Sequence, residues 1–163
     1  MKWLILTLIS FHSVLFAQST LGTGIQTGVD GIGLYSGLDF IYIKNKNSLG
    51  LGIKQYIIQY AFVRNLPGIY AKGAHEIQVS ENFSLNPTLS AIYYQNRVEG
   101  FKSKSVQLNF YTAFNWRKGQ FNLNVGPLIG INFQHTENLD WNEKYNFYYP
   151  NFGVQLGVDY KFK

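Results

Sequence analysis

Large apolar side chains occupy every second position along most of this chain. The pattern is clearest near the end, between positions 152 and 162. The apolar positions there are Phe152, Val154, Leu156, Val158, Tyr160 and Phe162. Small or polar residues lie between them, and a period of two predicts a β-strand with one apolar and one polar face. At about 3.3 Å per residue, the stretch is long enough to cross a bilayer at a tilt, which takes about 9–11 residues.

The same alternation predicts strands throughout the chain, eight in all. The earlier ones have the approximate ranges 21–29, 32–42, 49–57, 76–80, 83–93, 106–116 and 121–134. Asp30-Gly31 is typical of a tight hairpin turn between the first two. Among the later connections, 44–47, 81–82 and 118–119 are short, whereas 63–70, 98–104 and 136–150 are long. If both termini lie on one side, short turns there and long loops opposite are the pattern of an outer-membrane barrel.

Aromatic residues on the apolar faces form two groups. The group nearer the short turns is Phe40, Tyr42, Phe83, Phe114, Trp116, Phe121, Tyr160 and Phe162, and the other group is Tyr93, Phe133 and Phe152. Two such bands are what the two membrane interfaces predict.

Composition decides which face points inward, because a soluble lipocalin-like carrier has the same period with the apolar face inside. A soluble barrel needs a charged outer face, but charged residues are only 14% of this chain, and the polar faces are mostly Gly, Asn, Gln and Ser. We therefore expect an all-β, eight-stranded, antiparallel, up-and-down transmembrane barrel. Pro87 and Pro127 fall inside predicted strands and count against it, since each removes a ladder donor, although bulges could absorb them.

The first residues are typical of an export signal. Lys2 is followed by a mostly apolar stretch that is too short for a membrane helix, and Ala17 is an acceptable cleavage point. We expect a signal peptide at 1–17 and an outer-membrane barrel at 18–163. The chain has no cysteine, and its net charge of +5 is scattered rather than gathered in a basic run, so neither disulfides nor nucleic-acid binding is expected.

The final strand carries the motif Gln155-x-Gly157-x-x-Tyr160-x-Phe162, followed by Lys163. This motif resembles the C-terminal signature of bacterial outer-membrane β-barrels, and the chain is similar in size and strand number to the small OmpA/OmpX-type barrels. The resemblance implies recognition by the barrel-assembly machinery and a location in a Gram-negative outer membrane, among its lipids and lipopolysaccharide.

The predicted inner face carries a small set of charges. They are Asp39, Lys54, Glu76, Arg117, Asp159 and Lys161. An eight-stranded barrel is only wide enough for side chains, so no open solute pore is expected. The charges predict either a plug of ion pairs, since unpaired buried charge is costly, or a proton path or small gated conductance.

An enzyme is the alternative, because some eight-stranded barrels modify lipid A. A deacylase would need Ser, His and an acid near the outer rim. The candidates are His75-Glu76 and His135-Thr136-Glu137, but the Ser that the deacylase motif carries two positions after His is Glu137 here. No metal-ligand spacing appears, and Gly22-x-Gly24 and Gly50-x-Gly52 precede no helix, so no cofactor site is predicted.

The last long connection is rich in aromatic residues: Trp141, Tyr145, Phe147, Tyr148 and Tyr149. Exposed aromatics among polar neighbours suit binding to an extracellular protein or glycan, and mutual packing above the membrane is the other interpretation. The sequence thus favours a structural or surface-interaction role over a lipid A-modifying hydrolase.

Overall fold

The computed structural model describes residues 19–59, 67–98 and 100–162. All its regular elements are β-strands. They are β1 (Ser19–Val29), β2 (Gly33–Lys44), β3 (Asn47–Gln59), β4 (Pro67–His75), β5 (Ile77–Gln78), β6 (Phe83–Val98), β7 (Phe101–Lys118), β8 (Phe121–Asn138) and β9 (Glu143–Lys161). The predicted signal peptide lies outside the described residues. Within them, no helix has the length and hydropathy to cross a membrane.

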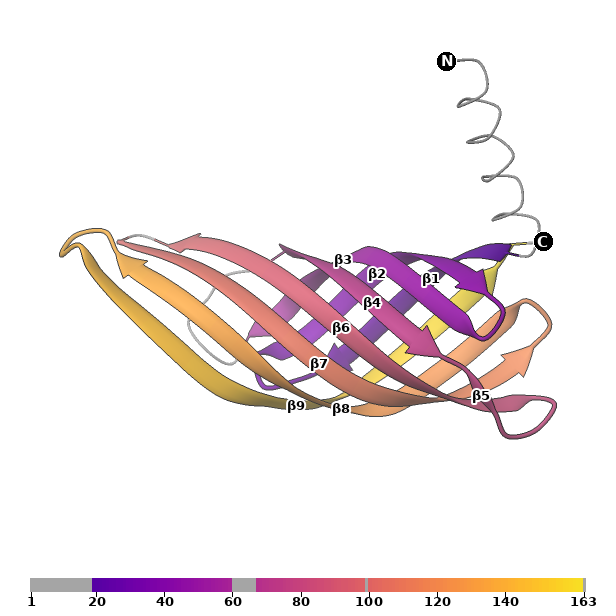
Figure 1. Cartoon of the computed structure of the whole chain (residues 1–163). Coiled ribbons are helices and arrows are strands. Elements are labelled where there is room, and N and C mark those ends of the chain that lie inside the picture. The colour runs from indigo at the N-terminus through magenta and orange to yellow at the C-terminus, as the bar shows by residue number, and fades with distance from the viewer. Residues whose placement is uncertain (1–18, 60–66, 99, 163) are drawn as a thin grey trace, which may run out of the picture.

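Each strand pairs antiparallel with its neighbours, and the sheet closes on itself (Figure 1). β1 pairs with β9, and β4 closes the other edge by pairing with β6. The short β5 continues the path of β4 along β6, so the barrel has eight strands, as predicted. Near the start of β1, Gly22 pairs with Lys161 at the end of β9. The start of β1 and the end of β9 therefore lie at the same end of the barrel.

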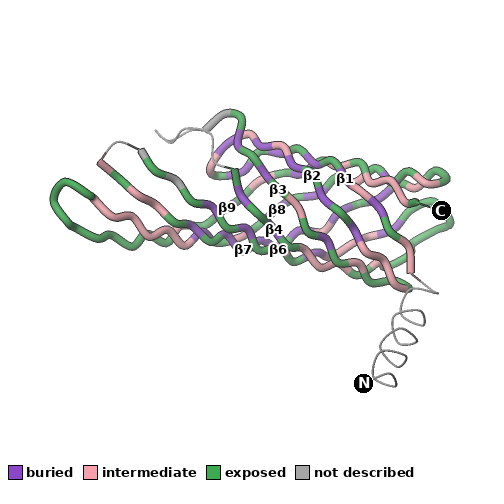
Figure 2. Tube along the Cα trace, turned by 90° about the horizontal axis from the view of Figure 1, so that it is seen from above, coloured by how far each residue is buried: buried purple, intermediate pink, exposed green. Residues whose placement is uncertain are grey.

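Buried and more exposed residues alternate along most of each long strand (Figure 2), although the first six residues of β9 are all exposed. Large apolar residues point outward; Phe40, for example, is 77% exposed. Asn, Gln, Ser, Tyr and Gly fill the interior, where Gln107, Asn132 and Asn151 are fully buried. The lipocalin-like alternative is therefore wrong, because its apolar residues would have to lie inside the barrel.

The strands of one half are far longer than a bilayer requires. β7 and β8 have 18 residues each and β9 has 19, whereas a spanning strand takes about 9–11. Their surplus forms a β-extension at the end opposite the termini (Figure 1). The predicted long loops at 98–104 and 136–150 are therefore wrong. β6 and β7 nearly meet at Gly100, and β8 and β9 are joined by the turn 139–142.

The strand predicted at 76–80 is also misplaced. The main strand here is β4, which begins at Pro67 inside the predicted connection 63–70, whereas β5 has only two residues. The small residues Gly68, Ala71 and Gly73 hide the alternation of β4 from the sequence pattern. The part of that connection at 63–66 lies outside the described residues.

Pro87 and Pro127, the two prolines inside predicted strands, each coincide with an interruption of a strand ladder that does not shift the register. The break between β4 and β5 lies opposite Asn86 and Pro87, since the flanking pairs are Ala74–Thr88 and Ile77–Leu85. The β7–β8 ladder is interrupted at Pro127, between the pairs Tyr111–Leu128 and Phe114–Val125. The barrel thus accommodates a missing donor by a local gap rather than by a bulge.

Candidate functional site

Asp30 is the centre of the interior at the end opposite the termini. Its Oδ2 accepts hydrogen bonds from Lys54 Nζ at 3.2 Å, Tyr56 OH at 2.6 Å and Gln107 Nε2 at 3.2 Å. Its Oδ1 accepts the backbone N–H of Ile32 at 2.9 Å. The side chains of Asp30 and Lys54 are 0% and 2% exposed, so this is a buried ion pair inside a hydrogen-bond network.

Tyrosines extend this network across the lumen. The Tyr94 hydroxyl has two acceptors within reach of its one proton, Tyr56 OH at 3.2 Å and Gln107 Oε1 at 3.1 Å. Tyr35 OH donates to Gln155 Oε1 at 3.1 Å. The Lys54 ammonium lies 3.4 Å from the centroid of the Tyr35 ring, which adds a cation–π contact. We call Asp30, Tyr35, Lys54, Tyr56, Tyr94 and Gln107 the upper plug.

A second ion pair lies deeper in the barrel, between Asp39 and Lys72. A cavity of about 10 Å³ separates this second ion pair from the upper plug. Lys54 and Lys72 both border the cavity. That volume accommodates about one water molecule. The middle of the lumen is therefore filled by side chains.

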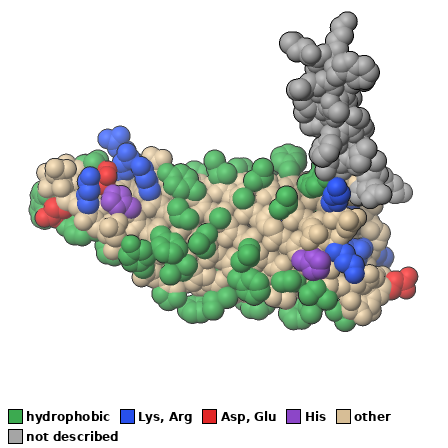
Figure 3. Space-filling view, viewed as in Figure 1, with side chains coloured by type: hydrophobic (Ala, Val, Ile, Leu, Met, Phe, Trp, Pro, Cys, Tyr) green, Lys and Arg blue, Asp and Glu red, His purple; other side chains and the backbone are tan. Residues whose placement is uncertain are grey.

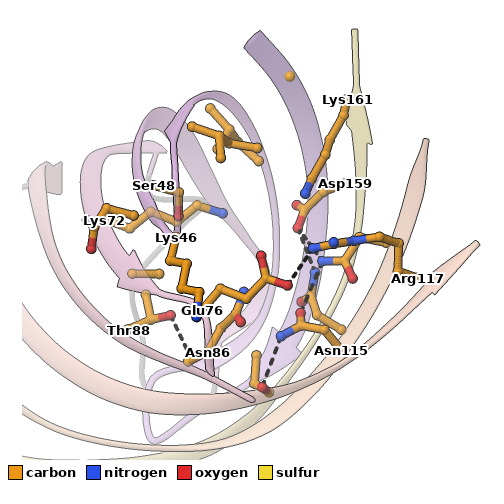
Figure 4. Close-up of a pocket in the computed structure, with 18 of the residues that line it drawn as sticks. Lys46, Ser48, Lys72, Glu76, Asn86, Thr88, Asn115, Arg117, Asp159 and Lys161 are labelled. Atoms are coloured by element: carbon orange, nitrogen blue, oxygen red, sulfur yellow. Dashed lines mark hydrogen bonds and ion pairs between the residues drawn. The ribbon is translucent and has the colours of Figure 1, made fainter. Parts of the chain in front are cut away.

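The end near the termini holds a larger polar cavity of about 60 Å³ (Figure 4). Arg117 reaches across it to Glu76, with Nη2 and Oε1 2.6 Å apart. The Asp159 carboxylate accepts hydrogen bonds from the amides of Asn122 at 3.3 Å and Asn124 at 3.1 Å. Lys161 lines the same cavity. These groups line a vestibule that carries both signs of charge.

The six charges predicted to face the lumen all lie on interior-facing positions, in two separate places. Lys54 belongs to the upper plug, whereas Asp39, Glu76, Arg117, Asp159 and Lys161 lie around Lys72 and the vestibule. Sequence reasoning missed two partners. Asp30 was interpreted only as a turn residue, and Lys72 falls on the unrecognised strand β4. An acid next to a turn at a strand end was the signal available for Asp30.

The aromatic residues predicted to form a loop lie on the hairpin of β8 and β9. Trp141 is 75% exposed in the turn, and Tyr148 contacts Phe133 on the outer face with ring centroids 5.6 Å apart. The opposite face carries Tyr145 and Phe147, whose rings stack at 6.3 Å. Tyr149 lies lower on that face, where its hydroxyl bonds Asn132 and Gln134.

His135 lies on the outer face of the β-extension. Its Nδ1 contacts Asn146 Oδ1 at 2.8 Å, and its Nε2 contacts Glu137 Oε1 at 3.4 Å. The neighbouring Ser103 and Thr136 hydroxyls bond each other on the opposite face. The described residues thus give His135 an acid but no hydroxyl nucleophile. In the same described part of the chain, no group of three or more His, Asp or Glu side chains is arranged to hold a metal.

The residues of the C-terminal motif divide between the two faces of β9. Gln155 is buried in the lumen, and Gly157 lies against Asn124, where a Cβ would meet its amide group. Tyr160 and Phe162 are on the outer face, with Tyr160 5.1 Å from the ring of Phe121. The motif therefore combines lumen packing with an outward aromatic pair.

No protein-family model matches this chain, and no curated protein matches its sequence. Among solved structures, the N-terminal β-barrel domain of Pseudomonas aeruginosa OprF is similar, with a TM-score of 0.57, 10% identity and coverage of 89% of this chain and 98% of that one. Neisserial surface protein A has a TM-score of 0.51, 15% identity and coverage of 88% and 96%. At these identities the likeness is one of fold, that of eight-stranded outer-membrane barrels.

Proposed function

We propose that this protein is an outer-membrane barrel that conducts no solute and presents its β-extension as an interaction surface outside the cell. The observation that carries the proposal is the upper plug. A buried ion pair and its hydrogen-bond network fill the lumen where a pore would need an aqueous path.

The height of the apolar surface supports a membrane location. Hydrophobic side chains cover the middle of the molecule, and charged ones gather toward its two ends (Figure 3). On β7 the outward residues from Val106 to Trp116 are apolar except Thr112. That stretch is about 34 Å long at about 3.4 Å per residue, and a strand tilt of about 40° reduces its height to about 26 Å. Outer-membrane barrels carry an apolar band of about 25 Å.

Strand lengths support the orientation. The turns at the end with the termini are short, as at Asn45-Lys46, and short turns in such barrels face the periplasm. The β-extension then lies outside the cell, with Trp141 at its tip. A paired β-hairpin displays its aromatic residues at fixed positions, which lowers the entropy cost of binding an extracellular protein or glycan.

Conductance tests the proposal. The chain without residues 1–17 is refolded and inserted into planar bilayers. A wide porin is the positive control. We expect no stepwise conductance and no sugar-driven swelling of liposomes, because the upper plug leaves no continuous water column. Recovery of a heat-shifted band on a gel shows that the inserted protein is folded. Steady stepwise currents from folded protein would contradict a closed lumen.

A further inference from the structure

The outer face of the β-extension carries charged residues arranged in rows across four strands. Cross-strand pairing puts Arg97, Lys102, Glu137 and Lys144 side by side in one row. The next row toward the membrane is Gln95, Lys104, His135 and Asn146. The row below that is Tyr93, Val106, Phe133 and Tyr148. We call Arg97, Lys102, Lys104 and Lys144 the cationic shelf.

The order of these rows follows the layers of a membrane surface. The row with Tyr93, Phe133 and Tyr148 closes the apolar band, as an aromatic girdle does at an interface. Each further row lies two residues along the strand, or about 5 Å higher at a tilt of about 40°. The two rows of the shelf therefore lie about 5 Å and about 10 Å above the band. The headgroup layer is about 5–8 Å deep on each side, so the lower row lies within it and the upper row at its outer edge.

Glu137 lies between Lys102 and Lys144 in the upper row of the shelf. Glu137 Oε1 lies 3.9 Å from Lys144 Nζ and 3.4 Å from His135 Nε2. The hydrogen bond from His135, aided by Lys144 and Lys102, keeps the pKa of the Glu137 carboxyl below its usual value. The Lys144 side chain is still 63% exposed, and Arg97 and Lys104 are exposed too. The shelf thus carries four cations and one carboxylate, which leaves a net positive surface.

We infer that the cationic shelf binds the phosphate groups of a phosphorylated glycolipid in the outer leaflet. Lysine and arginine bind phosphate by charge-assisted hydrogen bonds, and basic clusters beside a spanning segment attract anionic lipid headgroups. The apolar rows below the shelf provide a surface for the acyl chains of the same molecule. A lipid held by both layers fits this face better than a soluble anion, which would contact only the upper two rows.

The test compares two neutralised variants in detergent micelles. In the first, Lys102→Gln, Lys104→Gln and Lys144→Gln remove three shelf charges. The control, Lys44→Gln with Lys118→Gln, removes two outward charges at the other end of the barrel. Bis-phosphorylated lipid A, its dephosphorylated form and inorganic phosphate are the probes, and native mass spectrometry reads the bound fraction.

We expect the unmodified protein and the control to bind bis-phosphorylated lipid A alike. The triple variant should bind it roughly 100-fold more weakly, since each charge near an anionic lipid surface contributes about a fivefold factor. A heat-shifted gel band shows that each variant is folded. If the triple variant fails to fold, Lys144→Glu alone serves, because that side chain is largely in solvent.

Equal binding by the folded triple variant would overturn the inference, as would equal binding of dephosphorylated lipid A. Displacement of lipid A by inorganic phosphate at similar concentration would assign the site to a free anion and reject the lipid. The inference rests on the proposed outward orientation, but micelles have no sides. A failure of binding is therefore distinct from a failure of the proposed orientation or of the closed lumen.

Discussion

Replacing Asp30 with asparagine removes the charge at the centre of the upper plug. The asparagine side chain would keep an oxygen for the backbone N–H of Ile32, so the turn between β1 and β2 remains capped. At the position of Oδ2, an amide NH₂ would replace the carboxylate oxygen. This NH₂ would face three donors, those of Lys54, Tyr56 and Gln107.

The expected loss in the free energy of unfolding is about 3–5 kcal/mol, the cost of removing one partner of a buried ion pair. The pair has this full value because both side chains are shielded from water. The double variant Asp30→Asn with Lys54→Met should recover part of the loss, since no uncompensated charge then remains in the lumen.

The assay is urea unfolding in lipid vesicles, followed by the fluorescence of Trp116, which leaves the lipid-facing surface on unfolding. Glu76→Gln is the matched control. Its partner Arg117 is 35% exposed and Glu76 is 19% exposed, so water screens this pair and the expected loss is at most about 1 kcal/mol.

The reasoning is refuted if Asp30→Asn lowers the free energy of unfolding by no more than Glu76→Gln does. It is refuted equally if adding Lys54→Met to Asp30→Asn lowers stability further, because the buried ammonium would then not be the source of the loss.

Two other predictions address the seam and the orientation. Gly153→Ala should destabilise the barrel by about 1–3 kcal/mol in the same urea assay, because the new Cβ meets the backbone oxygen of Val29 across the β1–β9 seam. Gly73→Ala is the control and should be nearly neutral, because its Cβ comes no closer than 3.6 Å to Leu49. Equal losses of stability in the two variants would contradict this prediction. In intact cells, an impermeant maleimide should label the Trp141→Cys variant and spare the Lys46→Cys variant. The chain has no native cysteine, so each label reports only the introduced one. Labelling of Lys46→Cys alone would show that the orientation is the reverse of the proposed one.

The sequence pattern was sufficient for most of the fold within the membrane, with β4 as the exception. Alternation predicted eight antiparallel strands, and the shortage of charge predicted that the apolar face lies outside. Both signals are strong because lipid demands an apolar residue at every second position of a spanning strand. Phe152 to Phe162 is the clearest case.

The pattern failed where that demand ends. Above the membrane both faces meet water, so residues such as Ser103 and Lys104 no longer alternate in polarity, and paired strands resemble loops. The same reason hid the hairpin that carries Trp141. On β4, small residues concealed a strand that carries Lys72, the partner of Asp39.

Only the tertiary structure decided which charges meet. Asp30 and Lys54 come from a turn and a strand, and their contact depends on the register of β1, β2 and β3. The cationic shelf likewise takes Arg97, Lys102 and Lys144 from three strands into one row. A slip of one residue in any of these pairings would exchange the faces of a strand, and register is set by the packing of the whole barrel rather than by any one segment.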